Sequence, residues 1–288
     1  MRKFGPGIAT FLCGLLIFAL AATALPPVIP AASKDSEGEQ LKALLARSGF
    51  DAQLAEVPGM MASQLRQQGN KMPTGEEKQV AEAMESAFAL ERLRATVLTE
   101  VRTRYHAGHM EQTMAFLDSP LGKRLVALEV AASTPEGLEK VAEYGRNMAE
   151  QPPAEARVNL MLRIDEAASV TEASLNMFAV TLLAMISAMQ EFVPEEKRMS
   201  GEDMEAFRDQ LRQQTAQLFL SQTLTTFLYA YQDVPEADLE KYITFLESPA
   251  GQWYQTTLQE ALIKAIADSS TAFGRKVRQL AESTRRTT

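Results

Sequence analysis

Two histidines and an acid lie close enough in the sequence to bind a metal ion. His106 and His109 flank Gly108, and Glu111 follows, so a metal could find two imidazoles and a carboxylate here. The spacing is not the helical His-Glu-x-x-His of zinc proteases, and the glycine indicates a loop. The chain has no other histidine, and its one cysteine, Cys13, is distant in sequence. We therefore expect a polar loop here, with no metal and no other cofactor.

Two serines are the second set of candidates, because each stands before a proline and close to a glycine. Ser119 and Ser248 lie in the repeated pattern Phe-Leu-acid-Ser-Pro-x-Gly, at 116–122 and 245–251. A nucleophile elbow of the α/β-hydrolase type needs a glycine on both sides of the serine and a strand before it. The helical pattern before each serine and the proline after it do not fit that requirement. We predict no catalytic residue and no enzymatic activity.

The same residues fit a corner between two helices. Proline disfavours helical geometry in the residue before it and suits the first position of a helix. Serine at that boundary is a favoured N-cap, and a glycine in the first turn lets another backbone approach. The predicted structural motif comprises Phe116, Ser119, Pro120, Gly122, Phe245, Ser248, Pro249 and Gly251.

The elements around these corners are predicted to be helices throughout. Hydrophobic residues make up 46% of the 288 residues, which is enough for a sizeable core, whereas glycine (15) and proline (13) are sparse. Ala, Leu, Gln, Glu and Met are abundant, and most of these residues favour helices. Helices are expected near 154–168 and 171–191, and Thr134-Pro135 starts another. The sequence predicts an all-α, multi-helix bundle.

A second repeated signal indicates an internal duplication. Thr74-Gly-Glu-Glu and Ser200-Gly-Glu-Asp each place a hydroxyl residue three positions before an acid, as at a capped helix start. The two helix starts are separated by almost the same length of chain as the two corners, and a small length difference in one loop reconciles the two spacings. We predict two tandem helical repeats with Ser-Pro-x-Gly helix corners, which meet at Pro152-Pro153 and share one core.

The N-terminus has the layout of a secretory signal peptide. Arg2 and Lys3 precede an uncharged stretch at 7–25, and cleavage is expected after Ala24 or, as a later alternative, near Ala32. The apolar stretch is also long enough to stay in the inner membrane as an uncleaved anchor. The predicted organisation is a signal peptide at 1–24, a linker at 25–40, a first helical repeat at 41–150 and a second at 151–288.

Charge and apolar runs limit the possible partners. The net charge of −8 disfavours nucleic acid, and a chain with one cysteine cannot form an internal disulfide. The uncharged run at 173–189 fits a central core helix, a contact between two subunits or, at its length limit, a membrane span. The many methionines suit helix faces in a core, and a methionine-lined core could also hold an apolar ligand.

The corner motif carries a resemblance to a known family. An aromatic residue followed by Ser-Pro-x-Gly after a short helix, at 105–128 and again at 234–262, resembles the bacterial exported proteins of domain of unknown function 2059. The resemblance implies an all-helical, periplasmic protein of a Gram-negative bacterium. It implies no activity and no catalytic residue.

The sequence therefore leaves two functions open. The first is a periplasmic or secreted protein without enzymatic activity that acts by protein–protein contact, as a homodimer or with another protein, in an envelope scaffold. The alternative is a carrier of a lipid or other apolar small molecule between its helices. Contact with a membrane is expected only through 7–25, if that segment is not cleaved.

Overall fold

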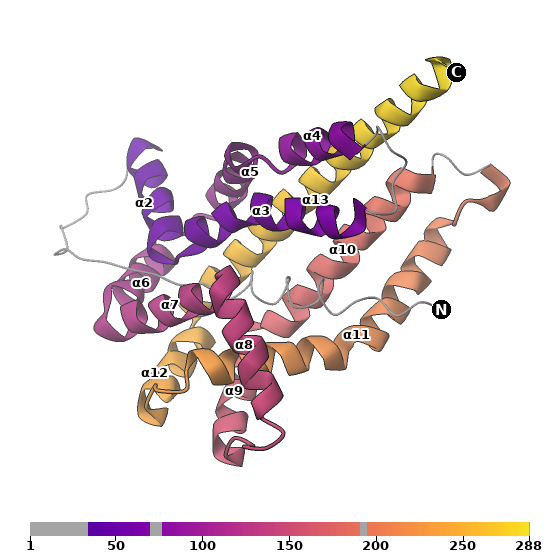
Figure 1. The fold of residues 1–288 in the computed structure, drawn as a ribbon. Coiled ribbons are helices and arrows are strands. Elements are labelled where there is room, and N and C mark those ends of the chain that lie inside the picture. Colours follow the sequence, from indigo (N-terminus) through magenta and orange to yellow (C-terminus); the bar gives the residue numbers. More distant parts are fainter. Residues whose placement is uncertain (1–33, 70–76, 191–194, 288) are drawn as a thin grey trace.

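The computed structural model describes residues 34–69, 77–190 and 195–287, which fold almost entirely into helices (Figure 1). No strand is found in these three ranges, so the all-α prediction is confirmed for them. In chain order the helices are α2 (Lys34–Arg47), α3 (Phe50–Gly69), α4 (Glu77–Ala87), α5 (Leu90–Thr103), α6 (Ala107–Asp118), α7 (Pro120–Ser133), α8 (Pro135–Asn147), α9 (Glu155–Ala168), α10 (Val170–Gln190), the 3-10 helix η1 (Glu195–Lys197), α11 (Gly201–Ala230), α12 (Glu236–Glu247) and α13 (Pro249–Thr287).

The start of the described chain corrects one predicted boundary. The signal peptide or anchor lies outside the described residues, as do both of its cleavage positions. The linker predicted for 25–40 is too long, because α2 already begins at Lys34. The buried Leu41, Leu44 and Leu45 follow steps of three and one, which places them on one face of a helix. These leucines belong to the predicted first repeat, and packing of their face against α3, α5 and α6 stabilises a helix whose first residues, from Lys34, extend into the predicted linker.

Of the two helix starts predicted at Thr74 and Ser200, only the one at Ser200 lies within the described residues. Ser200 starts α11 with a capping box, in which its Oγ accepts from the N–H of Asp203 (3.1 Å) and the Asp203 carboxylate accepts from the N–H of Ser200 (2.9 Å). The matching signal at Thr74 lies outside the described residues.

The last helix, α13, is the centre of the structure. It packs against α4, α5 and α6 and also against α9, α10 and α12. Figure 1 shows α13 running diagonally through the molecule, with α2, α4 and α5 towards one side, α8, α9, α11 and α12 towards the other, and α3 crossing it in this view. Helices from both predicted repeats therefore depend on one element from the end of the chain.

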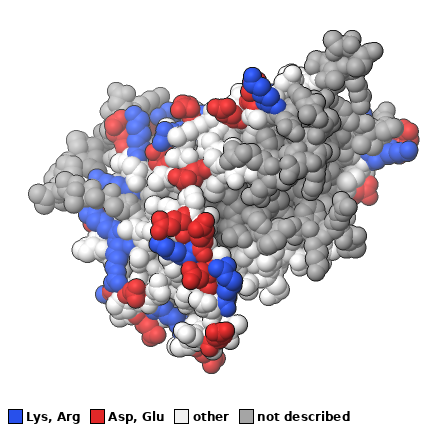
Figure 2. Space-filling model, in the orientation of Figure 1, with Lys and Arg blue, Asp and Glu red and all other residues white. Residues whose placement is uncertain are grey.

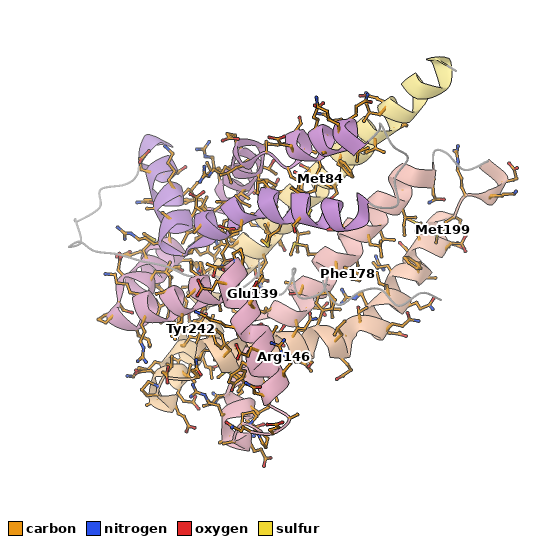
Figure 3. All side chains as sticks on the ribbon, viewed as in Figure 1. Met84, Glu139, Arg146, Phe178, Met199 and Tyr242 are labelled. Carbon is orange, nitrogen blue, oxygen red and sulfur yellow. The ribbon has the colours of Figure 1, made fainter. Side chains whose placement is uncertain are left out.

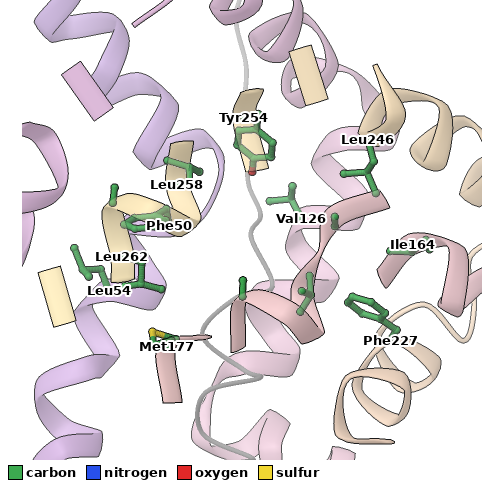
Figure 4. Packing of buried hydrophobic residues seen from close by; sticks show 14 of the residues in the cluster. Phe50, Leu54, Val126, Ile164, Met177, Phe227, Leu246, Tyr254, Leu258 and Leu262 are labelled. Carbon is green, nitrogen blue, oxygen red and sulfur yellow. The ribbon is translucent and has the colours of Figure 1, made fainter. Parts of the chain in front are cut away.

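The buried hydrophobic side chains form a single cluster that draws on both predicted repeats. Figure 4 shows Phe50 and Leu54 of α3 beside Leu258 and Leu262 of α13. All four side chains are at most 1% exposed. The two predicted repeats thus share one core, as the short connection at Pro152-Pro153 suggested.

The helices predicted near 154–168 and 171–191 are found as α9 and α10, and side chains of α13 fix the bend between them. The chain turns at Ser169, whose φ of 54° lies in the left-handed region. Gln252 donates its Nε2–H to the carbonyl oxygen of Ala167 (2.7 Å), and Gln259 does so to that of Ala168 (2.7 Å). The last carbonyls of α9 are therefore satisfied by α13 rather than by solvent.

The uncharged run in α10 divides into two parts. Its first part is core, since Ala173, Leu175, Met177, Phe178 and Ala179 are all buried. Further along, Leu182, Leu183 and Ile186 are only partly buried. The core interpretation therefore holds for the first part of α10, and the second part presents apolar side chains towards the surface.

A membrane interpretation of α10 depends on its neighbour. Within the described ranges, no single helix combines the length and apolar character needed to cross a membrane. The segments Glu155–Ala168 and Val170–Ala184, bent by 55° against each other, meet the length and composition requirements only when taken together.

A pair of charge substitutions tests this division of α10. Phe178→Glu should abolish cooperative folding, because the side chain is 7% exposed and packs on Phe219 with ring centroids 5.5 Å apart. Leu183→Glu should leave the helical content intact, because its side chain reaches solvent. Circular dichroism measures the first effect, and light scattering shows whether Leu183→Glu also breaks up an oligomer. Unfolding by Leu183→Glu to the same extent as by Phe178→Glu would make the whole run a core segment.

Candidate functional site

The first corner serine holds the end of one helix and the start of the next. Ser119 stands between α6 and α7, where its Oγ donates to the carbonyl oxygen of Phe116 (2.6 Å) and accepts from the N–H of Gly122 (3.0 Å). Pro120 is the first residue of α7. A Cβ on Gly122 would overlap the carbonyl oxygen of Phe116, so glycine lets α6 end directly against the first turn of α7. Both hydrogen-bonding functions of the hydroxyl are thus used by the backbone.

The second corner repeats this geometry between α12 and α13. The Oγ of Ser248 donates to the carbonyl oxygen of Phe245 (2.6 Å) and accepts from the N–H of Gly251 (3.1 Å). Pro249 begins α13. A Cβ on Gly251 would overlap the carbonyl oxygen of Phe245, as at the first corner. Neither serine has the strand and glycine pair of a nucleophile elbow, and each acts as an N-cap.

A third corner of the same kind was only partly recognised in the sequence. Thr134 caps α8, donating its Oγ1–H to the carbonyl oxygen of Ala131 (2.9 Å) and accepting from the N–H of Gly137 (3.0 Å). Pro135 follows the cap, and a Cβ on Gly137 would overlap the carbonyl oxygen of Ala131. The pattern Thr134-Pro135 predicts the helix start, whereas the role of Gly137 follows only from the close approach of the Ala131 carbonyl. The common pattern is therefore Ser/Thr-Pro-x-Gly.

The structure brings the two predicted corner phenylalanines together. The rings of Phe116 and Phe245 stack with centroids 3.8 Å apart and planes within 4° of each other. Tyr242 of α12 continues the stack on Phe116, at 5.8 Å and 7°. Figure 3 shows Tyr242 where α12 lies close to α6 and α7. The residues that end α6 and α12 therefore form one aromatic contact between the two halves of the chain.

Two hydrogen bonds across this contact form a matched pair. The indole Nε1–H of Trp253 donates to the carbonyl oxygen of Arg104 (2.7 Å). The guanidinium of Arg124 donates to the carbonyl oxygen of Asp233 (2.5 Å). Trp253 follows Arg124, and Asp233 follows Arg104, by the same sequence offset that separates the two corner serines. The two hydrogen bonds therefore join positions separated by one common offset, in opposite directions across the contact.

The two histidines also belong to the contact between the halves. His106 is the N-cap of α6, and its Nδ1 accepts from the N–H of His109 (3.2 Å). The His109 Nδ1–H donates to the carbonyl oxygen of Pro249 (3.1 Å). Partial burial and the neighbouring His106 lower the pKa of His109. The expected polar loop is therefore wrong for Gly108 and His109, which lie in the first turn of α6, because His106 caps the helix just before them.

Metal ligands do not gather around these histidines. Glu111 is exposed. In the part of the chain that the structure describes, no group of three or more His, Cys, Asp or Glu is placed to hold a metal ion.

A buried carboxyl near the aromatic contact is the most unusual group in the core. Glu129 of α7 is 1% exposed, and its Oε1 accepts from the hydroxyl of Tyr231, which is the C-cap of α11. The hydroxyl of Tyr242 also faces the carboxyl. Tyr254 of α13 completes the cluster and lies near Ser48, without an aligned hydrogen bond between them. We call Glu129, Tyr231, Tyr242 and Tyr254 the tyrosine–glutamate cluster.

Burial dominates the titration of the tyrosine–glutamate cluster. It raises the pKa of Glu129 from 4.5 to about 8, although the hydrogen bonds from Tyr231 and Tyr242 act in the opposite direction. Burial also raises the pKa values of Tyr231, Tyr242 and Tyr254 well above their usual range. At neutral pH the carboxyl therefore carries a proton, and the cluster is uncharged.

The position of Glu129 on the core face of α7 could have predicted its burial from the sequence. Leu121, Leu125 and Leu128 place the core face of α7, and Glu129 lies one helical turn after Leu125 on that face. The position that matches Glu129 in the second half, at the offset of the two corners, is Leu258, which is fully buried in α13. Because Leu258 belongs to the core, the acid at the corresponding position, Glu129, is expected to be buried as well.

On the face drawn in Figure 2, the described charged residues do not gather into a patch of one sign. Figure 2 shows Lys and Arg interspersed with Asp and Glu among the described residues of that face. Several of these charges form exposed pairs, such as Lys140 with Glu136 and Arg163 with Glu240. Exposed pairs of this kind contribute little to stability.

The corner geometry predicts a specific cost for a single methyl group. Gly122→Ala and Gly251→Ala should each lower the free energy of unfolding by roughly 1–3 kcal/mol, because the new Cβ displaces a neighbouring backbone carbonyl. Ser119→Ala should cost about 1 kcal/mol through the lost cap. Urea unfolding of the whole chain, followed by circular dichroism, measures these changes.

Gly59→Ala in α3 is the matched control. A Cβ at Gly59 meets no atom within 4 Å, so the substitution should stabilise the helix by roughly 0.5–1 kcal/mol. Equal effects at Gly59, Gly122 and Gly251 would contradict the role assigned to the corner glycines.

Comparison with known proteins adds no relative from which a role could be transferred. The chain matches no family model, no curated protein and no solved structure.

Proposed function

We propose that this chain is an exported protein without enzymatic activity that works by contact with another protein at the bacterial cell envelope. The observation that carries the proposal is the use made of the corners. At each corner the serine hydroxyl caps the backbone of the next helix. The phenylalanines of the two corners stack on each other. The corner units therefore bind each other within the chain. The face left for a partner is the partly buried apolar part of α10, at Leu182, Leu183 and Ile186.

The proposal includes an internal duplication of that unit. Its support begins with the helix bounds, since one sequence offset takes both ends of α6 onto those of α12 and the start of α7 onto that of α13. The stacked phenylalanines and the reciprocal bonds of Trp253 and Arg124 have the same offset. We infer two helical repeats related by an approximate two-fold axis that passes between Phe116 and Phe245.

Differences between the halves have local causes under this proposal. The first half breaks at Thr134-Pro135 into α7 and α8, whereas α13 continues without a break, because the matching positions in α13 carry no proline. The break between α4 and α5 falls at Phe88-Ala89, whereas α11 is one helix of 30 residues. The duplicated unit is therefore the short helix, the corner and the first turns of the next helix.

Export and family membership are parts of the proposal that rest on the sequence. The charged start, the apolar stretch at 7–25 and the small residues near Ala24 support a periplasmic or secreted location. Retention of 7–25 as an inner-membrane anchor is the alternative. The two Ser-Pro-x-Gly corners support the resemblance to domain of unknown function 2059.

A carrier of an apolar molecule remains the second candidate, and partly buried methionines favour it. Met60 and Met61 of α3 and Met84 of α4 pack against the core without being fully buried. Figure 3 places Met84 where α4 lies close to α3 and α13, and these helices are in contact with α4. Flexible thioether side chains adapt to apolar ligands of different shape.

The two functions are separated by what the protein binds in its own envelope. The full chain, tagged at its C-terminus, is crosslinked in living cells, purified and examined by mass spectrometry for both proteins and lipids. The interaction proposal predicts one protein, or a second copy of the chain, crosslinked to it at a constant ratio. Leu183→Glu, on the partly buried part of α10, serves as the variant in which a subunit contact at that face would be lost.

Recovery of a lipid at a constant ratio, with no crosslinked protein, would overturn the interaction proposal and support the carrier. In that case Met84→Ala should lower the amount of bound lipid. A product of chemical turnover in the purified sample would contradict both candidates.

A further inference from the structure

The tyrosine–glutamate cluster links helices from both halves of the chain. Glu129 comes from α7, whereas Tyr231, Tyr242 and Tyr254 come from the end of α11, from α12 and from α13. All four side chains are at least nine-tenths buried. Tyr231 stacks on Phe227 at 5.6 Å and meets Tyr242 edge to face at 6.2 Å, so the rings hold the carboxyl in a defined position.

The cluster is not needed to fill the core. The matching position in the second half is occupied by Leu258, which is 0% exposed and packs among apolar side chains. Burial of an ionised carboxyl costs several kcal/mol, and only protonation or full hydrogen bonding reduces that cost. In the described part of the chain, the buried Oε2 of Glu129 has no hydrogen-bond partner, and neither does the hydroxyl of Tyr254. An ionised carboxyl therefore fits this buried site poorly.

We propose that the tyrosine–glutamate cluster is a proton-controlled latch between the two halves, closed when Glu129 is protonated and loosened when Glu129 loses its proton. Ionisation would place a charge on the unpartnered Oε2, inside the contact between α7 and the helices α11, α12 and α13. Water or a rearranged tyrosine hydroxyl must then reach the carboxylate, and either requires these helices to separate locally. The response is an opening of the aromatic contact beside the corners.

Within the described ranges, no ion pair on the surrounding helices offsets this charge. The groups that act on Glu129 are the neutral hydroxyls of Tyr231 and Tyr242, and Tyr254 is the third phenol of the cluster. Three acids on helices packed against α7 form ion pairs of their own near the surface: Asp51 with Arg94, Asp118 with Arg47, and Glu136 with Lys140.

The direction of the pH effect follows from the raised pKa of Glu129. The folded chain holds the proton up to about pH 8, whereas the unfolded chain releases it near 4.5. The stabilisation by the bound proton is therefore complete below about pH 4.5 and is lost as the pH rises towards 8. The equilibrium constant for opening should rise by at most about tenfold per pH unit across that window.

The single tryptophan of the chain provides a local reporter of the latch. Trp253 donates to the carbonyl of Arg104 across the contact between the halves, so opening should change its fluorescence. Hydrogen exchange of the α7 and α12 amides, corrected for the intrinsic pH dependence of exchange, reports the same opening. The full chain is compared at about pH 6 and about pH 9, on either side of the titration.

The expected result is a loss of protection in α7 and α12 at the higher pH, together with a change at Trp253. Glu129→Gln should abolish both changes, since an amide does not ionise. Asp165→Asn is the matched control: Asp165 is a second buried acid with a raised pKa, but it lies on α9 and accepts from the N–H of Thr171 (2.8 Å). It should keep the wild-type response.

A pH response that survives in Glu129→Gln, or the absence of any response in the wild type, would overturn the latch. If Glu129→Gln does not fold, Glu129→Leu reproduces the residue found at 258 and replaces it as the test variant. Infrared spectroscopy of the wild type tests directly whether Glu129 is protonated. The carbonyl band of a buried protonated carboxyl must be present at about pH 6 and vanish by about pH 9, and its absence at the lower pH would refute the proposal.

Discussion

The close approach of a backbone carbonyl to a glycine at each Ser/Thr-Pro-x-Gly corner is the constraint on which the arrangement depends. Because Gly122 and Gly251 lack a Cβ, α6 and α12 end directly against the first turns of α7 and α13. That short path puts Phe116 and Phe245 at the helix ends, where they stack on each other. The second corner also starts α13, which packs against helices from both halves of the chain.

The contact between the halves combines an apolar face with an unusual polar centre. The aromatic rings and the bonds from Trp253 and Arg124 would hold two identical units equally well. Glu129 departs from that symmetry, because Leu258 stands at the matching position. A carboxyl in a closed core destabilises the protein whenever it ionises. Its place beside the contact makes the strength of that contact sensitive to protons, so one site joins the interaction and the regulatory proposals.

The sequence predicted local structure better than the contacts between distant segments. Ser119 and Ser248 were identified as caps because serine, proline and glycine act on the nearest backbone groups alone. The stacking of Phe116 on Phe245 needed the relative placement of two segments, which no local pattern contains. Glu129 was overlooked because an acid on a helix is usually solvated, and only the comparison with Leu258 marks it as buried. The start of α2 at Lys34 was missed because contacts with α3, α5 and α6 stabilise residues of weak local preference.

The most direct test of the proposed two-fold contact is the coupling energy between Phe116 and Phe245. Urea unfolding under identical conditions compares the wild type with Phe116→Leu, Phe245→Leu and the double variant. A control cycle combines Phe116→Leu with Phe219→Leu, because Phe219 packs on Phe178 in another part of the core. The account predicts a coupling of roughly 0.5–1.5 kcal/mol between Phe116 and Phe245, and additive effects for Phe116 with Phe219. Additive effects for Phe116 with Phe245 would contradict a contact between the halves at the corners.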